Sequence, residues 1–136
     1  MELNQEKIEA LLDTARQAAE RAYAPFSHFR VGAAILTEEG EVFTGCNVEN
    51  SSYGLTNCAE RTAIFTAVAA GALGRECELA AVAVVNSEGA ICSPCGACRQ
   101  VIYEFGPDAV VIYRAHNGEM AQTKARDLLP EGFRLR

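Results

Sequence analysis

The sequence lacks any long apolar run. Its most apolar stretches, Ala63–Leu73 and Leu79–Val85, are much shorter than the roughly 20 residues that a transmembrane helix needs. The segment Met1–Glu9 is polar and has no apolar core of the kind found in secretory signal peptides. We therefore expect a cytoplasmic protein that does not span a membrane.

Positive charge is also scarce. Twelve lysines and arginines face 18 acidic residues, which gives a net charge of −6. This balance disfavours binding to a nucleic-acid duplex, which rewards basic surfaces, and favours a small-molecule substrate or a protein partner. The chain contains no internal repeat, low-complexity tract or linker. Its 136 residues predict a single domain, residues 1–136, long enough to bury its own core.

Histidine is rare, but cysteine is not. The two histidines, His28 and His116, have no partner ligands at useful spacing, so we interpret both as surface residues. Six cysteines are present. In a reducing cytosol, cysteines favour metal binding or catalysis over disulfides. The chemistry of this chain is therefore expected to depend on thiols.

The pattern of apolar residues predicts helices that alternate with buried strands. Such an order predicts a layered α/β fold with helices on both faces of a sheet. The predicted elements are a helix from Asn4 to about Tyr23, strands Arg30–Thr37 and Glu41–Cys46 as a hairpin, a helix Ala59–Ala70, a strand Leu79–Val85, a helix from Pro94 to about Phe105, a strand Ala109–Tyr113, a weaker strand after Gly118, and a last helical turn at Lys124–Leu129.

Two cysteines lie near the start of the helix predicted to begin at Pro94. At that spacing, Cys95 and Cys98 share one helix face, and the helix N-terminus favours their thiolates. The pair alone is compatible with a thioredoxin-like redox motif or with half of a metal site. Together with Cys92 it also resembles part of a ferredoxin sequence, but no fourth cysteine follows after three residues.

A third cysteine opens the other strong helix. Cys58 lies at the start of "NCAERTA", and two helix N-termini can face each other across a crevice of an α/β sheet. Three protein ligands with an open fourth position are typical of catalytic zinc, whereas a structural zinc module prefers four ligands. Glu60, two residues after Cys58, can reach the open position and move a proton there. A redox protein would not need this second segment.

The complete pattern, Cys58-x-Glu60 followed by Pro94-Cys95-x-x-Cys98, is a known signature of zinc-dependent nucleobase deaminases. The chain resembles the cytidine deaminase family, in its small homotetrameric form that uses three cysteines. The resemblance covers nearly the whole chain. It lies in "FRVGAAI" (29–35), "GCNVENSSYG" (45–54), "NCAERTA" (57–63), "SPCGACRQV" (93–101) and "DLLPEGF" (127–133).

This resemblance implies a three-layer α/β/α fold with a mixed five-stranded sheet. It implies one Zn²⁺ per subunit on Cys58, Cys95 and Cys98, and hydrolytic deamination of cytidine and deoxycytidine to uridine and deoxyuridine in pyrimidine salvage. In that reaction Glu60 takes a proton from the zinc-activated water and protonates N3, hydroxide attacks C4, and ammonia leaves. The alternative is a deaminase of a related cytosine nucleoside, of the blasticidin-S type.

The resemblance also implies residues that bind the substrate. Asn47 and Glu49 are alternate residues just past a strand, so both can point the same way, and the family assigns them to the ribose hydroxyls. Phe29, at the start of a predicted strand, is assigned to the pyrimidine ring, which an aromatic side chain suits.

Further roles depend on the assembly and on the charge of the metal site. Arg61 is the family's candidate for a guanidinium that hydrogen-bonds the zinc-bound sulfurs and offsets their negative charge. Phe133 is expected to reach into the site of a neighbouring subunit of a homotetramer, and Tyr53 to do the same. Cys46, Cys77 and Cys92 are interpreted as small buried or loop residues.

Overall fold

The computed structural model describes residues 3–136, so Met1 and Glu2 of the predicted domain lie outside the described residues. None of the described helices has both the length and the hydropathy that a membrane span requires. The elements are, in chain order, α1 (Gln5–Ala19), β1 (Val31–Thr37), β2 (Val42–Cys46), the 3₁₀ turn η1 (Tyr53–Leu55), α2 (Ala59–Ala69), β3 (Leu79–Asn86), α3 (Gly96–Phe105), β4 (Val110–Arg114), β5 (Met120–Lys124) and α4 (Ala125–Leu128).

The five strands form one mixed sheet in the order β2-β1-β3-β4-β5. Strand β1 is antiparallel to both β2 and β3, and the β1–β2 pair is the predicted hairpin. Strands β3 and β4 run parallel, with α3 between them in sequence, and β5 returns antiparallel to β4. The predicted mixed five-stranded α/β sheet is confirmed.

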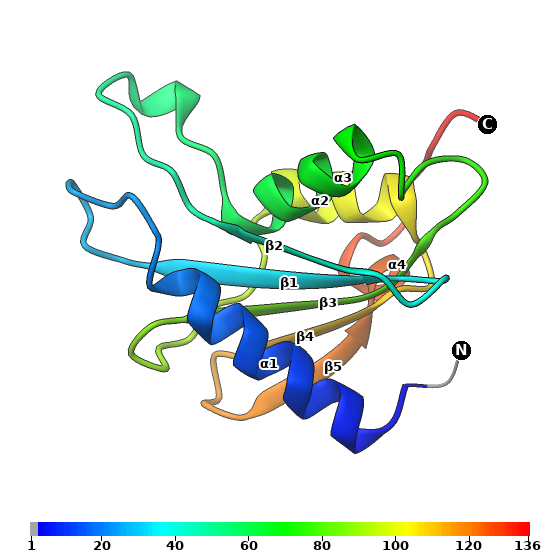
Figure 1. The fold of residues 1–136 in the computed structure, drawn as a ribbon, viewed down its shortest axis with the longest axis horizontal. Helices are drawn as coiled ribbons and strands as arrows, with labels where there is room; N and C mark the ends of the chain where they lie inside the picture. The colour runs from blue at the N-terminus through cyan, green and yellow to red at the C-terminus, as the bar shows by residue number, and fades with distance from the viewer. Residues whose placement is uncertain (1–2) are drawn as a thin grey trace.

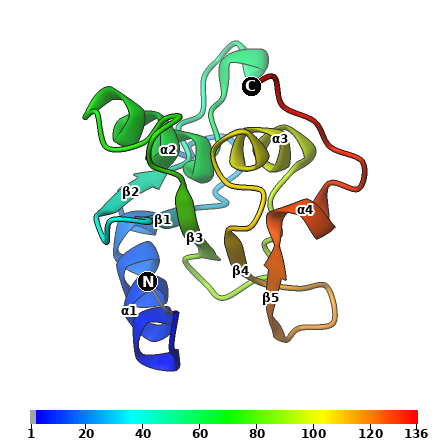
Figure 2. The same cartoon turned by 90° about the vertical axis from the view of Figure 1, so that its right-hand side faces the viewer.

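Helices cover both faces of this sheet. Figures 1 and 2 show α1 on one face and α2 and α3 on the other. Strand β1 is buried along its whole length, because alternate side chains face opposite helical layers. Ala33 and Ile35 belong to the α2–α3 side of the core, and Ala34 and Leu36 to the α1 side.

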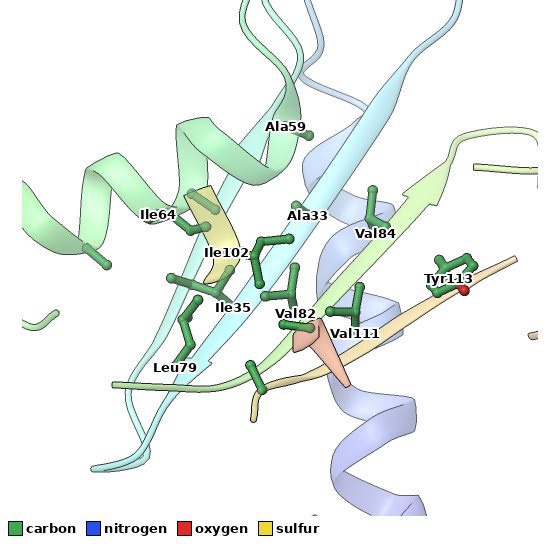
Figure 3. Close-up of a cluster of buried hydrophobic side chains, with 14 of the residues drawn as sticks. Ala33, Ile35, Ala59, Ile64, Leu79, Val82, Val84, Ile102, Val111 and Tyr113 are labelled. Atoms are coloured by element: carbon green, nitrogen blue, oxygen red, sulfur yellow. The ribbon is translucent and has the colours of Figure 1, made fainter. Parts of the chain in front are cut away.

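The larger of the two core clusters lies between the sheet and α2 and α3. Figure 3 shows Ile35, Val82 and Val111, from three neighbouring strands, close to Ile64 and Ile102 from the two helices. All five side chains are almost completely buried. This apolar layer holds the first turns of α2 and α3 on the same face of the sheet.

A glycine allows α2 to approach the sheet closely. A Cβ atom on Gly45 of β2 would lie 2.4 Å from the Ala63 nitrogen and 2.6 Å from the Ala59 carbonyl oxygen. Such contacts are shorter than packed atoms tolerate, so only glycine permits this helix–strand distance. The position of the first turn of α2 therefore depends on Gly45.

Two helix ends differ from the prediction. Helix α1 ends at Ala19 rather than near Tyr23, because the backbone of Tyr23 pairs with residues 47–49 instead of continuing the helix. Helix α3 begins at Gly96 rather than at Pro94. Cys95 is extended and caps that helix, since its side chain accepts a hydrogen bond from the Cys98 nitrogen. Pro94 therefore precedes the helix instead of occupying its first position.

Candidate active site

The N-termini of α2 and α3 bring three cysteines together. Cys58 is the N-cap residue of α2, Cys95 is the N-cap residue of α3, and Cys98 lies in the first turn of α3. All three are free thiols, and their sulfur atoms lie within 4.8 Å of one another. The structure thus assembles the three predicted ligands from segments almost 40 residues apart.

The spacing of these sulfurs fits zinc. Tetrahedral zinc–thiolate bonds of about 2.3 Å place the sulfur atoms about 3.8 Å apart. The Sγ atoms of Cys58 and Cys95 are separated by 3.8 Å. Within residues 3–136 the cluster has these three members, and Cys92 is not one of them. Three thiol ligands would leave one tetrahedral position for water or substrate.

Hydrogen bonds favour a thiolate at Cys58. The neighbouring Cys98 thiol and the Arg61 guanidinium hold the pKa of Cys58 well below its usual range. The Arg61 Nη2 atom lies 3.2 Å from the Cys58 sulfur. Cys58 and burial in turn raise the pKa of Cys98. The site therefore favours one thiolate beside a cation, and deprotonated thiols are what a metal site requires.

Glu60 is buried in the first turn of α2. Glu60 is only 4% exposed. This burial, together with the negative charge of the nearby Cys58 thiolate, raises the pKa of the Glu60 carboxyl to about 7. A carboxyl with a pKa near neutrality can both accept and release a proton. It lies beside the cysteines, at the wall of a cleft.

The cleft has a volume of about 320 Å³, at the lower end of the range for small-molecule sites. It brings together most of the residues predicted from the sequence. The predicted residues that line it are Phe29, Asn47, Glu49, Cys58, Glu60 and Cys95. Because these residues come from four separate segments, the cleft exists only in the folded chain.

Asn47 and Glu49 are bonded to the protein itself. The Asn47 amide nitrogen donates to the Phe29 carbonyl at 2.8 Å, and its oxygen accepts from the Val31 nitrogen at 2.9 Å. The Glu49 carboxylate accepts from the backbone nitrogens of Phe26 and Ser27 and from the Ser27 hydroxyl. Both side chains line the cleft while also holding the segment that carries Phe29.

Phe133 and Tyr53 do not line the cleft of their own chain. Their exposed fractions are 69% and 75%. The Phe133 carbonyl accepts a hydrogen bond of 3.2 Å from the Gln100 side chain, so the backbone of the C-terminal tail is held against α3.

Several lining residues were not predicted from the sequence: Ser27, Val31, Thr56, Asn57 and Ser93. Cys92, interpreted from the sequence as a small buried or loop residue, also lines the cleft. Of these, Ser27 had a detectable signal. It lies two residues before Phe29 in the polar turn after Pro25, where serine hydroxyls commonly bond to nearby backbone. The others are ordinary loop or strand residues whose position depends on the tertiary fold.

Comparison with known proteins agrees with this site. The family model for the cytidine and deoxycytidylate deaminase zinc-binding region matches residues 5–114. This chain belongs to that deaminase family.

The deaminase relatives cover nearly the whole chain. A cytidine deaminase of Sporosarcina psychrophila is 47% identical over 93% of this chain and 90% of its own length. A cytidine deaminase of Mycobacterium tuberculosis is 46% identical over 92% of this chain and 88% of its own. The crystal structure of cytidine deaminase from Burkholderia pseudomallei has a TM-score of 0.83 and 51% identity, covering 96% of this chain and all of the other.

Membership of the deaminase family explains the thiol cluster. The matched zinc-binding region contains Cys58, Cys95 and Cys98, and the sulfur spacing fits that metal. Zinc is therefore the cofactor, at one ion for each three-cysteine cluster. A thioredoxin-like redox pair would not explain why Cys58 and Glu60 lie beside Cys95 and Cys98.

Proposed function

We propose that this protein catalyses the hydrolytic deamination of cytidine and deoxycytidine, which yields uridine or deoxyuridine and ammonia. The observation that carries the proposal is the position of Glu60. This buried carboxyl, with its pKa raised to about 7, lies beside three converging cysteine sulfurs in a cleft that also contains Phe29. The two curated relatives described above are named cytidine deaminases, which favours plain cytidine over a blasticidin-type nucleoside.

We also propose that residues 1–136 form one deaminase domain that acts in the cytoplasm, in the salvage of pyrimidine nucleosides. All six cysteines are free thiols, as expected for a reducing compartment. The relatives match this chain over most of their own length, which supports a single catalytic unit.

In the proposed reaction Cys58, Cys95 and Cys98 hold the zinc ion. When bound, zinc acts as a Lewis acid that lowers the pKa of a water molecule to about 7. Glu60 would accept a proton from the attacking water and deliver it to N3 of the cytosine ring, while the water oxygen bonds to C4. Glu60 would then carry the proton of the new C4 hydroxyl to the amino nitrogen, so that the C4–N bond breaks, ammonia leaves and C4 keeps the oxygen as a carbonyl. A pKa near 7 suits a group that must gain and lose a proton in every turnover.

Arg61 is proposed to tune the charge of the metal site. Three thiolates and Zn²⁺ carry a net charge of −1, which weakens the metal as a Lewis acid. The Arg61 guanidinium donates to the Cys58 sulfur at 3.2 Å and so withdraws electron density from it.

The other end of the cleft is proposed to bind the nucleoside. Phe29, 41% exposed, can pack against the pyrimidine ring. Asn47 uses one amide hydrogen on the Phe29 carbonyl, so its second hydrogen is available for a sugar hydroxyl. Glu49 accepts three hydrogen bonds from the protein. Since a carboxylate has about four acceptor positions, one remains for a sugar hydroxyl.

We propose a homotetramer whose sites are shared between subunits. Support comes from large apolar side chains that a single copy leaves exposed, at η1, on the outer side of α2 and in the tail: Tyr53, Leu55, Phe65, Val68, Phe133 and Leu135. Such groups mark association surfaces. Phe133 is free to enter a neighbouring cleft, because its carbonyl is held by Gln100 while its ring is exposed.

An activity assay tests the reaction. The zinc-loaded protein should convert cytidine to uridine with stoichiometric ammonia, monitored by chromatography and an ammonia assay. Glu60→Gln should bind the same amount of zinc but lose about 10²–10⁴-fold in kcat, since it cannot move the proton. Glu88→Gln, at an exposed glutamate, is the matched control and should retain full activity. A zinc-loaded wild type that does not deaminate cytidine or deoxycytidine contradicts the proposal.

A complementation experiment tests the shared sites. Glu60→Ala and Phe133→Ala chains should each be weakly active alone. Mixed tetramers made by co-expression should recover activity, because some sites then combine a normal Glu60 with a normal Phe133 from the neighbour. Mixtures no more active than the separate variants, or a monomer by light scattering, contradict the shared-site assembly.

A further inference from the structure

Ser27 holds the Glu49 carboxylate in one orientation. Its hydroxyl donates to Glu49 Oε2. The backbone nitrogens of Phe26 and Ser27 donate to the other oxygen, Oε1, at 2.9 and 3.2 Å. These bonds lower the pKa of Glu49, with the Ser27 hydroxyl making the largest contribution. The carboxylate is therefore fixed from both oxygens by one turn.

The same hydroxyl also holds Phe29. Ser27 Oγ accepts a hydrogen bond of 3.0 Å from the Phe29 nitrogen, which a hydroxyl can do while it donates its own proton. Asn47 holds the Phe29 carbonyl from the other side. Side chains thus bind both polar backbone groups of Phe29, the residue proposed to contact the base.

The turn needs these bonds to keep its shape. His28, between Ser27 and Phe29, has a φ of 58°, a left-handed conformation that non-glycine residues adopt uncommonly. The whole segment Pro25–Phe29 is exposed, so little burial is available to fix it. Hydrogen bonds to Ser27, Asn47 and Glu49 take the place of packing here.

We propose that Ser27 is a positioning residue that orients Glu49 toward one sugar hydroxyl and, through the same Oγ atom, sets the backbone of Phe29. The inference rests on the proposed function, because it assigns the sugar and base ends of that cleft to one hydroxyl group. Removing the hydroxyl leaves Glu49 Oε2 without its donor, while Oε1 keeps its two backbone donors, and leaves the Phe29 nitrogen without its partner. The carboxylate is then held from one oxygen only. The loss is expected in substrate binding and not in proton transfer, because the Ser27 hydroxyl bonds to Glu49 and Phe29, whereas Glu60 is the residue proposed to move the proton.

The test compares Ser27→Ala with wild type on two substrates. With cytidine, Ser27→Ala should raise KM about tenfold, the loss expected for one hydrogen bond to a charged group, with a smaller change in kcat and unchanged zinc content. With 2′,3′-dideoxycytidine, which lacks the 2′- and 3′-hydroxyls of the sugar but keeps the 5′-hydroxyl, the increase in KM should be smaller, because the hydroxyl assigned to Glu49 is one of the two that are missing. That analogue is measured by KM, or by its competitive inhibition constant if it is not turned over. Ser27→Thr keeps the hydroxyl and should restore most of the affinity.

Controls separate this role from a general effect on folding. Ser87→Ala, at an exposed serine outside the cleft, should leave KM and kcat for cytidine unchanged. If Ser27→Ala does not fold, Ser27→Cys offers a weaker donor of similar size, and its KM for cytidine should still exceed that of wild type. The inference is overturned if folded Ser27→Ala or Ser27→Cys has a normal KM for cytidine. It is also overturned if KM rises equally for cytidine and for the dideoxy analogue. An inactive wild type would instead contradict the proposed function.

Discussion

At its metal end the cleft is formed by the first turns of α2 and α3, whereas its other end is formed by exposed loops around Phe29 and Glu49. The metal-end residues Glu60 and Cys98 are buried, and both helices pack on the same face of the sheet. The residues from Pro25 to Phe29 are exposed and are held by side-chain hydrogen bonds. One end is fixed by packing and the other by polar contacts.

This difference matches what each end must do. A metal site needs its ligands at fixed distances before the ion binds, and helices packed on a sheet provide that rigidity. A substrate has to enter and leave, which suits the proposed binding residues Phe29 and Glu49, because they lie on loops that a rigid scaffold positions. Each end should therefore respond to a different kind of substitution, with the metal end giving the larger losses.

The largest effect is expected from loss of a metal ligand. Cys98→Ser should lose most of its zinc and nearly all activity, because the cluster would retain only two thiol ligands. Cys92→Ser is the matched control, since Cys92 is also buried but is not in the cluster. It should retain zinc at one ion per chain, measured by atomic absorption. Normal zinc content in Cys98→Ser would contradict the assignment.

The next largest effect is expected at Arg61. Arg61→Ala should keep its zinc, because the three cysteines remain, but should lose about 10–100-fold in activity. The guanidinium would no longer hydrogen-bond the Cys58 sulfur. Arg75→Ala, at an exposed arginine after α2, is the control for loss of positive charge. Full activity of a zinc-replete Arg61→Ala enzyme would rule out the role.

A substitution at Gly45 tests whether packing fixes the metal end. Gly45→Ala should lower the free energy of unfolding by about 1–3 kcal/mol, as overpacking usually does, because the new Cβ would collide with the backbone of α2. It should also weaken zinc binding. Gly74→Ala, where a Cβ meets no atom within 4 Å, is the control. Denaturant unfolding measures the free energy of unfolding, and competition with a chelator measures the affinity for zinc. If Gly45→Ala changed neither quantity, the metal site would not depend on this packing.

The smallest effect is expected from the charge of Glu49. The folded state lowers the pKa of Glu49 below its ordinary value of 4.5, first through Ser27. Any stability from the ionised carboxylate is therefore fully present above about pH 4.5 and is lost as the pH falls through the lowered pKa. The difference in unfolding free energy between wild type and Glu49→Gln should be constant from neutral pH to pH 5 and should shrink at lower pH. Glu39→Gln, in the exposed β1–β2 turn, should show no such change. If the difference in unfolding free energy between wild type and Glu49→Gln grew as the pH fell, the predicted pH dependence would be contradicted.

Much of the fold followed from local patterns. The apolar residues of α1, the hairpin and the buried strands were predicted within a few residues, because burial on one or two faces leaves a clear period in the sequence. The two wrong helix ends had different causes. Helix α1 stops early because Tyr23 pairs with residues 47–49, which is a non-local contact. At the start of α3 the cause is local, since Cys95 caps the Cys98 nitrogen three residues on, but cysteine is not among the residue types usually preferred as helix caps.

The candidate site also contains residues that the sequence predicts and contacts that it does not. Cys58, Glu60, Cys95 and Cys98 could be named from spacing, since helix starts and ligand chemistry restrict where such residues occur. The hydrogen bonds that join Ser27 to Glu49 could not be predicted, because they connect an exposed turn to a loop 22 residues away. The bond from the Phe29 nitrogen to Ser27 is local and is of a kind that a serine in a turn commonly makes.

The sequence by itself determined the chemistry of this protein: three thiols and a carboxylate at two helix starts, within an alternating α/β pattern. Only the tertiary structure decided the distances between those groups, the burial that raises the pKa of Glu60 to about 7, and the hydrogen bonds that hold Glu49 and Phe29. The physical reason is that residue types and helix starts are local properties. Burial and hydrogen bonding between distant segments exist only after the helices have packed on the sheet.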